Sequence, residues 1–310
     1  MTQTILFSSD LDDPVDWARA IAALRPELKI VDWRAVTAPE TVEFALLWKP
    51  PPGGLGPYKN LKGIQSLGAG VNQLDLAELP AGIPLARLID SSLTETMVDY
   101  AVASTYRHFR AFDRYERETR ERAWNYATPA RKADFPVGVM GTGVLGGATA
   151  ACLAGLGFPV AGWSRSRRAL PGVTAYAGLD ELPGFLGSVK MVICVLPLTA
   201  QTAGILNART FALLPRGSYV MNMGRGAHLV EADLVAAIEA GQIAGATLDV
   251  FSAEPLPRDH ALYGRPEILV TPHVAGGIAP GTAAATVIEN YDRTLAGKPL
   301  LNAVDPARGY

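Results

Sequence analysis

Three glycines in a fixed order constrain the fold more than any other feature of this sequence. Gly141, Gly143 and Gly146 form a GxGxxG pattern within VGVMGTGVLGGATAACLAGLGF, after an apolar run and at the start of an apolar helical pattern. In such a strand–loop–helix, the first glycine permits a tight turn, the second lets phosphates approach the backbone, and the third permits close helix–strand packing. The free N–H groups of the helix N-terminus favour the phosphates. The pattern predicts a dinucleotide-binding loop rather than a plain glycine turn, with these residues in contact with the cofactor: Gly141, Thr142, Gly143, Val144, Leu145 and Gly146.

The rest of the chain alternates between strand-like and helical patterns. Short apolar runs typical of buried strands occur at 5–7, 29–33, 44–48, 63–67 and 84–89, and again at 137–140, 159–163, 189–196, 218–223, 245–250 and 267–271. Helical patterns stand near Pro14, over 231–241 and over about 281–295. This alternation predicts an α/β fold with two doubly wound parallel sheets.

One long helix is expected in the middle of the chain. Apolar residues recur with a helical period from Val98 to Phe112, and DRYERETRERAW continues with alternating charges that include Asp113 and Arg117 four residues apart. A solvated face is the favoured interpretation of these charges. The helix as a whole suits a connector between domains or a dimer arm.

Composition excludes several classes of protein. The chain has 310 residues, enough for two domains, with 49% hydrophobic and 19% charged residues and a net charge of -2. This balance and the lack of a basic face argue against nucleic acid as a partner. No apolar run approaches the roughly 20 residues of a membrane span, and MTQTILFSSDLDD has neither a basic segment nor a long apolar run. Cys152 and Cys194 are far apart and suit reduced thiols. We therefore expect a cytoplasmic protein with no membrane partner and no metal site.

The cofactor is predicted from the end of the strand that follows the glycine loop. Dinucleotide folds usually place an acidic residue there, which binds the ribose 2′-hydroxyl. Here Ser164 takes that position, and Arg165 and Ser166 follow. A carboxylate would repel a 2′-phosphate, whereas a guanidinium pairs with it. The sequence therefore predicts NADP (NADPH) bound by Ser164, Arg165 and Ser166. Whether Arg167 and Arg168 also bind it or are simply solvated is left open.

Three polar residues follow three successive strands of the same sheet. They are Arg225 in NMGRGAHLVE, Glu254 in LDVFSAEPLP and His273 in ILVTPHVAGG. The carboxyl end of a parallel strand faces the cofactor crevice, so these residues are the candidates for acid–base chemistry. Of the other three histidines, His108 and His260 are expected on the surface. His228 is expected near the site, on the side where a helix begins.

Four of these stretches together resemble one family. GTGVLG, NMGRGAHLVEADLVAAI, LDVFSAEPLP and TPHVAG are similar to the D-isomer-specific 2-hydroxyacid dehydrogenases, and the resemblance extends over essentially the whole chain. LGAGVNQL, CLAGLGFPVAGWSRSRR and the ending DPARGY most resemble the glyoxylate/hydroxypyruvate reductase A branch. The resemblance implies a Rossmann NADP-binding domain, residues 97–277, inserted into a discontinuous flavodoxin-like substrate domain, residues 1–96 and 278–310. It also implies a homodimer.

The resemblance also implies residue roles. Arg225, Glu254 and His273 would be the catalytic set in NADPH-dependent reduction of glyoxylate, hydroxypyruvate or a similar 2-oxo acid to the D-2-hydroxy acid. Arg225 would hold and polarise the substrate, His273 would donate the proton, and Glu254 would orient and charge the imidazole. Further cofactor contacts would be Leu196, Pro197, Met223, Gly224 and Asp249. Further substrate contacts would be Ala69 and Gly70, together with Trp48, for which a place in the substrate wall and simple core packing are equally open.

Other functions remain open at this stage. A non-catalytic NAD(P)-sensing regulator would share the glycine loop, and related dehydrogenases act on other 2-hydroxy acids or on formate or phosphite. In the formate enzymes an amide replaces the carboxylate partner of the histidine, so Glu254 favours proton-transferring chemistry. The preferred 2-oxo acid, the physiological direction and any contact of Met97 with the nicotinamide are left open.

Overall fold

The computed structural model describes residues 3–305, and the chain divides into two compact units. The first unit comprises the described residues up to Leu93 and those from Gly277 onward, and the second is Thr94–Gly276. Apart from Asp305, the ending DPARGY lies outside the described residues. Both units are built on an entirely parallel sheet, which confirms the predicted α/β fold. No helix of the described chain is long and apolar enough to cross a membrane.

The first unit contains five strands in the order β2-β1-β3-β4-β5, which is the flavodoxin-like order. Side chains alternate between the two faces of β1, so that Ile5 and Phe7 enter one apolar cluster and Leu6 enters another. The strands are β1 (Gln3–Ser8), β2 (Leu28–Asp32), β3 (Val42–Leu47), β4 (Gly63–Ser66) and β5 (Leu85–Ala86).

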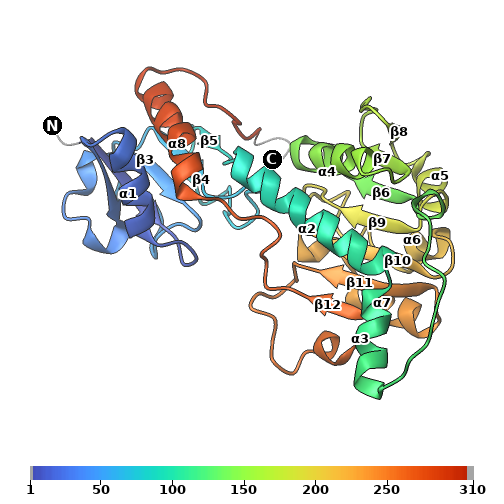
Figure 1. The fold of residues 1–310 in the computed structure, drawn as a ribbon. Helices are drawn as coiled ribbons and strands as arrows, with labels where there is room; N and C mark the ends of the chain where they lie inside the picture. The colour runs from blue at the N-terminus through green and yellow to red at the C-terminus, as the bar shows by residue number, and fades with distance from the viewer. Residues whose placement is uncertain (1–2, 306–310) are drawn as a thin grey trace. The chain divides into compact units, whose positions relative to one another are not determined.

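Two helices cover one face of this sheet. α1 (Pro14–Leu24) begins where the Asp13 side chain accepts the Val15 N–H, and it buries Trp17 and Ile21. α8 (Pro280–Leu295) comes from the other end of the chain and packs beside α1 (Figure 1). Among the five strands, only β1 and β2 are joined by an α-helix. The other connections are loops and 3₁₀ turns, since proline- and glycine-rich stretches such as KPPPGGLGP cannot continue a helix.

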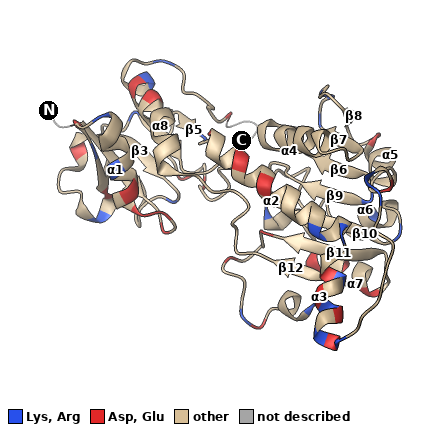
Figure 2. Ribbon diagram, in the orientation of Figure 1, with Lys and Arg blue, Asp and Glu red and all other residues tan. Residues whose placement is uncertain are grey.

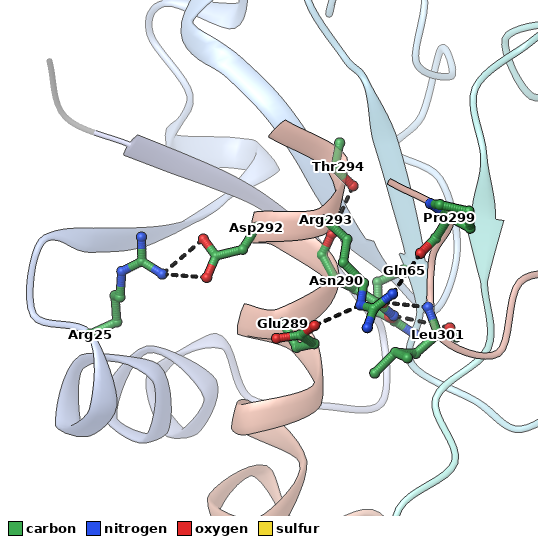
Figure 3. A network of polar contacts seen from close by, with 9 residues as sticks. All are labelled: Arg25, Gln65, Glu289, Asn290, Asp292, Arg293, Thr294, Pro299 and Leu301. Atoms are coloured by element: carbon green, nitrogen blue, oxygen red, sulfur yellow. Dashed lines mark hydrogen bonds and ion pairs between the residues drawn. The ribbon is translucent and has the colours of Figure 1, made fainter. Parts of the chain in front are cut away.

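A buried amide on α8 fixes the C-terminal segment to the sheet. Asn290 is fully buried; its Nδ2 donates to Gln65 Oε1 at 2.7 Å and to the Leu301 carbonyl at 3.2 Å, and its Oδ1 accepts the Leu301 N–H at 2.7 Å (Figure 3). Gln65 in turn donates to the Ser66 and Ala86 carbonyls. Buried polar groups must be hydrogen-bonded, so this set of contacts permits one register of α8 on β4.

We expect Asn290→Ala to destabilise the protein by about 3 kcal/mol, because it leaves Gln65 and Leu301 with buried unpaired groups. The measurement is the free energy of unfolding in urea. The matched control is Glu289→Ala, the neighbouring residue on α8, whose exposed ion pair with Arg293 is worth less than about 1 kcal/mol. Equal effects of the two substitutions would contradict a specific role for the buried amide.

The second unit contains seven parallel strands in the order β12-β11-β10-β9-β6-β7-β8, the Rossmann arrangement. The order reverses between β6 and β9, where such sheets bind ligands. The strands are β6 (Val137–Met140), β7 (Val160–Ser164), β8 (Val173–Ala177), β9 (Met191–Cys194), β10 (Ser218–Asn222), β11 (Ile243–Leu248) and β12 (Ile268–Val270). The helices between them are α4 (Val144–Gly155), α5 (Leu182–Gly187), α6 (Ala208–Leu213) and α7 (Glu231–Glu239).

The predicted single long helix is two helices, α2 (Ser91–Phe109) and α3 (Phe112–Glu121). The chain turns at Ala111, which has a φ of +54°. The turn places Asp113 and His108 side by side in the interior, with Asp113 Oδ2 3.7 Å from His108 Nδ1. Burial would raise the pKa of Asp113, but the adjacent His108 ring lowers it.

Two sequence predictions about this region are therefore wrong. His108 is 2% exposed rather than on the surface, and its ring lies against Tyr219 with Nε2 2.9 Å from the Thr247 hydroxyl. Asp113, expected on a solvated face with Arg117, is buried instead. The remaining charges of α3 do crowd its surface (Figure 2), and Arg114 pairs with Glu118 at 3.2 Å.

Candidate active site

The predicted site residues of the second unit gather along one edge of its sheet. Each follows the carboxyl end of a strand, and the ladder of backbone hydrogen bonds continues past the strands into these loops: Met223 N–H donates to the Cys194 carbonyl, and Asp249 N–H to the Asn222 carbonyl. The edge carries, from β7 to β12, Ser164–Ser166, the glycine loop, Leu196 with Pro197, Met223 to Arg225, Asp249 with Glu254, and His273.

The three glycines of the loop have three different surroundings. Gly141 has a φ of +99°, and a Cβ there would lie 2.7 Å from the Val195 carbonyl oxygen. A Cβ on Gly146 would lie 1.9 Å from the Gly141 carbonyl oxygen, so α4 could not pack against the turn. A Cβ on Gly143 would meet no atom of another segment within 4 Å. Gly141 and Gly146 are therefore needed by the fold itself, whereas Gly143 leaves its space open to a ligand.

The end of β7 is joined to the glycine loop by side chains. Ser164 Oγ lies 2.8 Å from Thr142 Oγ1, and Arg168 donates to the Thr142 carbonyl at 2.9 Å. Arg167 pairs with Glu181 and donates to a carbonyl of β8. Arg165 is exposed and makes no hydrogen bond or ion pair to any residue that the structure describes. The three arginines thus differ: two are engaged within the protein, and the third is available to a ligand.

Two neighbouring side chains hold the backbone of Arg225 by hydrogen bonds. Its N–H donates to His228 Nδ1 at 3.0 Å, and its carbonyl accepts from Asn222 Nδ2 at 2.9 Å. A Cβ on Gly226 would lie 1.9 Å from the Phe251 carbonyl carbon, so this glycine lets the loop press against the one after β11. Burial lowers the pKa of Arg225, and the negative charge of Glu254 opposes that effect. The guanidinium is largely desolvated, which strengthens its interaction with an anion.

Glu254 and His273, nineteen residues apart, form a direct pair. Glu254 Oε2 lies 2.8 Å from His273 Nδ1, and Glu254 Oε1 accepts the Phe251 N–H at 2.9 Å. Partial burial would raise the pKa of Glu254, but hydrogen bonds from His273 and Phe251, with the charges of His273 and Arg225, lower it. Because the carboxylate engages Nδ1, a proton passed from this imidazole to a substrate would come from Nε2.

Asp249 fixes the loop that carries His273. It is 1% exposed, and its carboxylate accepts the Val274 N–H at 2.8 Å and the Ala275 N–H at 2.9 Å. Its backbone carbonyl accepts the His273 N–H at 2.9 Å. All of these contacts join Asp249 to the loop that follows β12. Contact of Asp249 with a cofactor stays a prediction, as it does for Leu196, Pro197, Met223 and Gly224.

Two further residues shape the site: Asn222, which was not identified from the sequence, and His228, which was expected near the site but without a role. Asn222 and His228 each stand three residues from Arg225, a spacing that suits side-chain contacts with its backbone. His228 is fully buried, and its Nε2 lies 3.3 Å from the Pro197 carbonyl. Since Nδ1 accepts a hydrogen bond, the ring is neutral with its proton on Nε2, and burial lowers its pKa. His260, predicted at the surface, is half-buried and pairs with Glu231 at 3.2 Å.

The predicted substrate residues of the first unit are adjacent to one another. The Trp48 ring lies over the loop after β4, since a Cβ on Gly68 would be 2.9 Å from Trp48 Cζ3. The Ser66 hydroxyl accepts the Gly68 N–H at 3.1 Å. The N–H groups of Ala69 and Gly70 donate to no acceptor within residues 3–305. Two adjacent free N–H groups suit a carboxylate or another anion.

Three further sequence expectations concern Met97, the two cysteines and metal binding. Met97 on α2 is 6% exposed, and Cys152 and Cys194 are free thiols. Burial raises the pKa of Cys194 to about 12, so it is an inert core residue. Over the described part of the chain no group of three or more His, Cys, Asp or Glu side chains could hold a metal ion.

Comparison with known proteins identifies the family of this chain. Residues 102–275 match the family model described as D-isomer specific 2-hydroxyacid dehydrogenase, NAD binding domain. A protein of Yersinia enterocolitica named glyoxylate/hydroxypyruvate reductase A is 39% identical over 312 aligned residues, covering 99% of this chain and 99% of the relative. The chain belongs to the D-isomer specific 2-hydroxyacid dehydrogenases. The resemblance inferred from the motifs is thereby confirmed.

Solved structures support the same assignment for this 2-hydroxyacid dehydrogenase. A D-isomer specific 2-hydroxyacid dehydrogenase from Xanthobacter autotrophicus Py2, in complex with NADPH and MES, is 43% identical with a TM-score of 0.95, and the match covers 100% of both chains. A glyoxylate/hydroxypyruvate reductase from Sinorhizobium meliloti, in complex with NADP and sulfate, is 34% identical with a TM-score of 0.91, covering 99% of this chain and 100% of that chain.

Substitution of Gly146 should chiefly lower the stability of this dehydrogenase, whereas substitution of Gly143 should chiefly affect dinucleotide binding. We expect Gly146→Ala to lower the free energy of unfolding by more than about 3 kcal/mol, because the added methyl group meets the Gly141 carbonyl. Gly143→Ala should cost about 1 kcal/mol or less, because its methyl group meets nothing. Urea unfolding measures both. In a titration followed by protein fluorescence, Gly143→Ala should nevertheless lose dinucleotide binding. Normal binding by Gly143→Ala would contradict the assignment of this space to the phosphates.

Proposed function

We propose that the protein is an NADPH-dependent reductase that converts glyoxylate, hydroxypyruvate or a similarly small 2-oxo acid to the D-2-hydroxy acid. The observation that carries the proposal is the contact of Glu254 with His273 on the same sheet edge as the desolvated Arg225 and the glycine loop. The relatives named glyoxylate/hydroxypyruvate reductase A, in Yersinia enterocolitica and Serratia proteamaculans, support this class of substrate.

The residues at the glycine loop fit an NADPH molecule. Gly143 leaves room for the pyrophosphate, and α4 starts there with no side chain capping its N-terminal N–H groups. Ser164 stands where an acid would exclude a 2′-phosphate, and the unengaged guanidinium of Arg165 would bind that phosphate. The NADPH and NADP complexes of the two solved relatives support this choice. When bound, NADPH supplies a hydride to the carbonyl carbon.

The side chains of the protein manage the charge and the proton. Negative charge grows on the carbonyl oxygen during reduction, and Arg225 stabilises that charge while holding the substrate. His273, as an imidazolium, donates the proton from Nε2 to the same oxygen. Glu254 holds Nδ1 at 2.8 Å, which fixes the ring and favours its charged form. The unpaired N–H groups of Ala69 and Gly70 bind the substrate carboxylate, and Trp48 forms part of the substrate wall.

A homodimer remains part of this proposal, implied by the family. The extended stretch after α3 presents two large aromatic side chains, Trp124 at 97% exposed and Tyr126 at 86% exposed. Aromatic side chains are enriched at protein interfaces, so a second copy of the chain is the partner that we assign to this segment.

We expect His273→Ala and Arg225→Ala each to lower kcat/KM for NADPH-dependent reduction of glyoxylate and hydroxypyruvate by a factor on the order of 10² to 10⁴, because each removes a group that acts on the developing oxyanion. The measurement is the loss of NADPH absorbance under steady-state conditions. The control is His260→Ala, a histidine paired with Glu231, which should keep its activity. Wild-type protein that reduces no member of a broad 2-oxo acid panel would overturn the proposal in favour of a cofactor-sensing role.

We expect Arg165→Gln to weaken NADPH binding by about tenfold, because a charge-assisted hydrogen bond to the 2′-phosphate is lost, while NADH binding is unchanged. Arg167→Gln, which removes a guanidinium already paired with Glu181, is the matched control and should keep the preference for NADPH. The dissociation constants of both cofactors measure the effect. A wild-type preference for NADH would contradict the role assigned to Arg165 and Ser164.

A further inference from the structure

A chain of hydroxyl groups leads from α2 to the carboxylate that holds the His273 loop. The Tyr100 hydroxyl lies 2.6 Å from Thr271 Oγ1, and Thr271 Oγ1 donates to Asp249 Oδ1 at 2.6 Å. A threonine hydroxyl has one proton, and here it goes to the carboxylate. Tyr100 must therefore donate to Thr271. Burial, partly offset by hydrogen bonds with Thr271 and Ser104, raises the pKa of Tyr100 to about 12, so this phenol remains a donor.

The far end of the chain supports a residue in an unfavourable conformation. His273 has a φ of +54°, a left-handed conformation that costs free energy for a side chain other than glycine. The loop keeps this conformation because Asp249 binds three consecutive N–H groups. The Asp249 carboxylate accepts those of Val274 and Ala275, and the Asp249 carbonyl accepts that of His273. The orientation of the carboxylate therefore decides where the imidazole stands.

We propose that Tyr100 and Thr271 are positioning residues for His273. Their hydroxyl groups hold the Asp249 carboxylate in the orientation in which it binds the His273 loop. Asp249 Oδ1 accepts both the Thr271 hydroxyl and the Val274 N–H, so losing the first contact frees the carboxylate to turn away from the second. The inference rests on the proposed function in that His273 donates the proton. Tyr100 and Thr271 act in this proposal only through Asp249.

Isosteric substitutions separate the hydroxyl groups from the space that they fill. Thr271→Val removes the donor to Asp249, and we expect kcat to fall about tenfold with the KM values for NADPH and the 2-oxo acid within about twofold of wild type, because an imidazole misplaced by a fraction of an ångström transfers its proton slowly. Thr271→Ser keeps the hydroxyl and should restore kcat. Tyr100→Phe should lower kcat about threefold, since Thr271 still reaches Asp249.

Tyr106→Phe is the matched control. Tyr106 lies on the same helix, and its ring packs edge-on against Phe109 and Phe158. No hydrogen bond of its hydroxyl is found in the described chain. This variant should keep the wild-type kcat. If Thr271→Val does not fold, Tyr100→Phe and Tyr106→Phe still decide the question.

A second measurement uses the protein without cofactor or substrate. The Cε1–H resonance of His273, assigned by its absence in His273→Asn, should shift or broaden in Thr271→Val and Tyr100→Phe but not in Thr271→Ser or Tyr106→Phe. Wild-type kcat and an unchanged resonance in both Thr271→Val and Tyr100→Phe would overturn the proposal, as would equal loss of kcat in Thr271→Val and Thr271→Ser. If the wild type reduces no 2-oxo acid, the proposed function fails, while the resonance still decides whether the hydroxyl groups position His273.

Discussion

Close contact between backbones at one edge of the seven-stranded sheet is the constraint on which the candidate site depends. At Gly141, Gly146 and Gly226 a Cβ would stand between 1.9 and 2.7 Å from a backbone atom of a neighbouring segment. Each contact presses one loop against the next, so the loops after β6, β9, β10 and β11 have little freedom. Arg225, Glu254 and His273 can then be held by a few hydrogen bonds each. Catalytic side chains benefit from such rigid support because small displacements are costly.

Buried polar groups fix the position of segments that apolar packing alone would allow to shift. Asn290 selects one placement of α8 on the first sheet, and Asp249 selects one conformation of the His273 loop. An apolar side chain tolerates small slides, whereas a buried amide or carboxylate loses free energy as soon as a partner is lost. Both units thus use one well-satisfied polar group to fix a segment far away in sequence.

The sequence predicted what local patterns determine. The GxGxxG spacing, the apolar runs and the polar residues after strands led to the fold, to the sheet edge and to Arg225, Glu254 and His273. It failed where tertiary contacts decide. The charges of α3 have a helical pattern whether or not Asp113 is buried, and only the turn at Ala111 brings it to His108. Arg165 and Arg167 likewise look alike in a sequence, and only the contacts of Arg167 with Glu181 and with a carbonyl of β8 distinguish them. Asn222, His228, Tyr100 and Thr271 act through individual side-chain hydrogen bonds, which leave no periodic signal in a sequence.

The charges of the site explain why a carboxylate rather than an amide stands at position 254. Burial lowers the pKa of Arg225, which shows that an isolated guanidinium is disfavoured there. The ionised Glu254 offsets that cost, and its own pKa is lowered by His273, Phe251 and Arg225. The stability that these contacts provide is present above the usual pKa of a glutamate and is lost as pH falls through the lowered value. An amide at position 254 would leave Arg225 without this compensating negative charge and would remove the carboxylate that contacts His273 Nδ1. The carboxylate therefore supports both the guanidinium and the imidazole to which the proposed mechanism assigns the substrate and the proton.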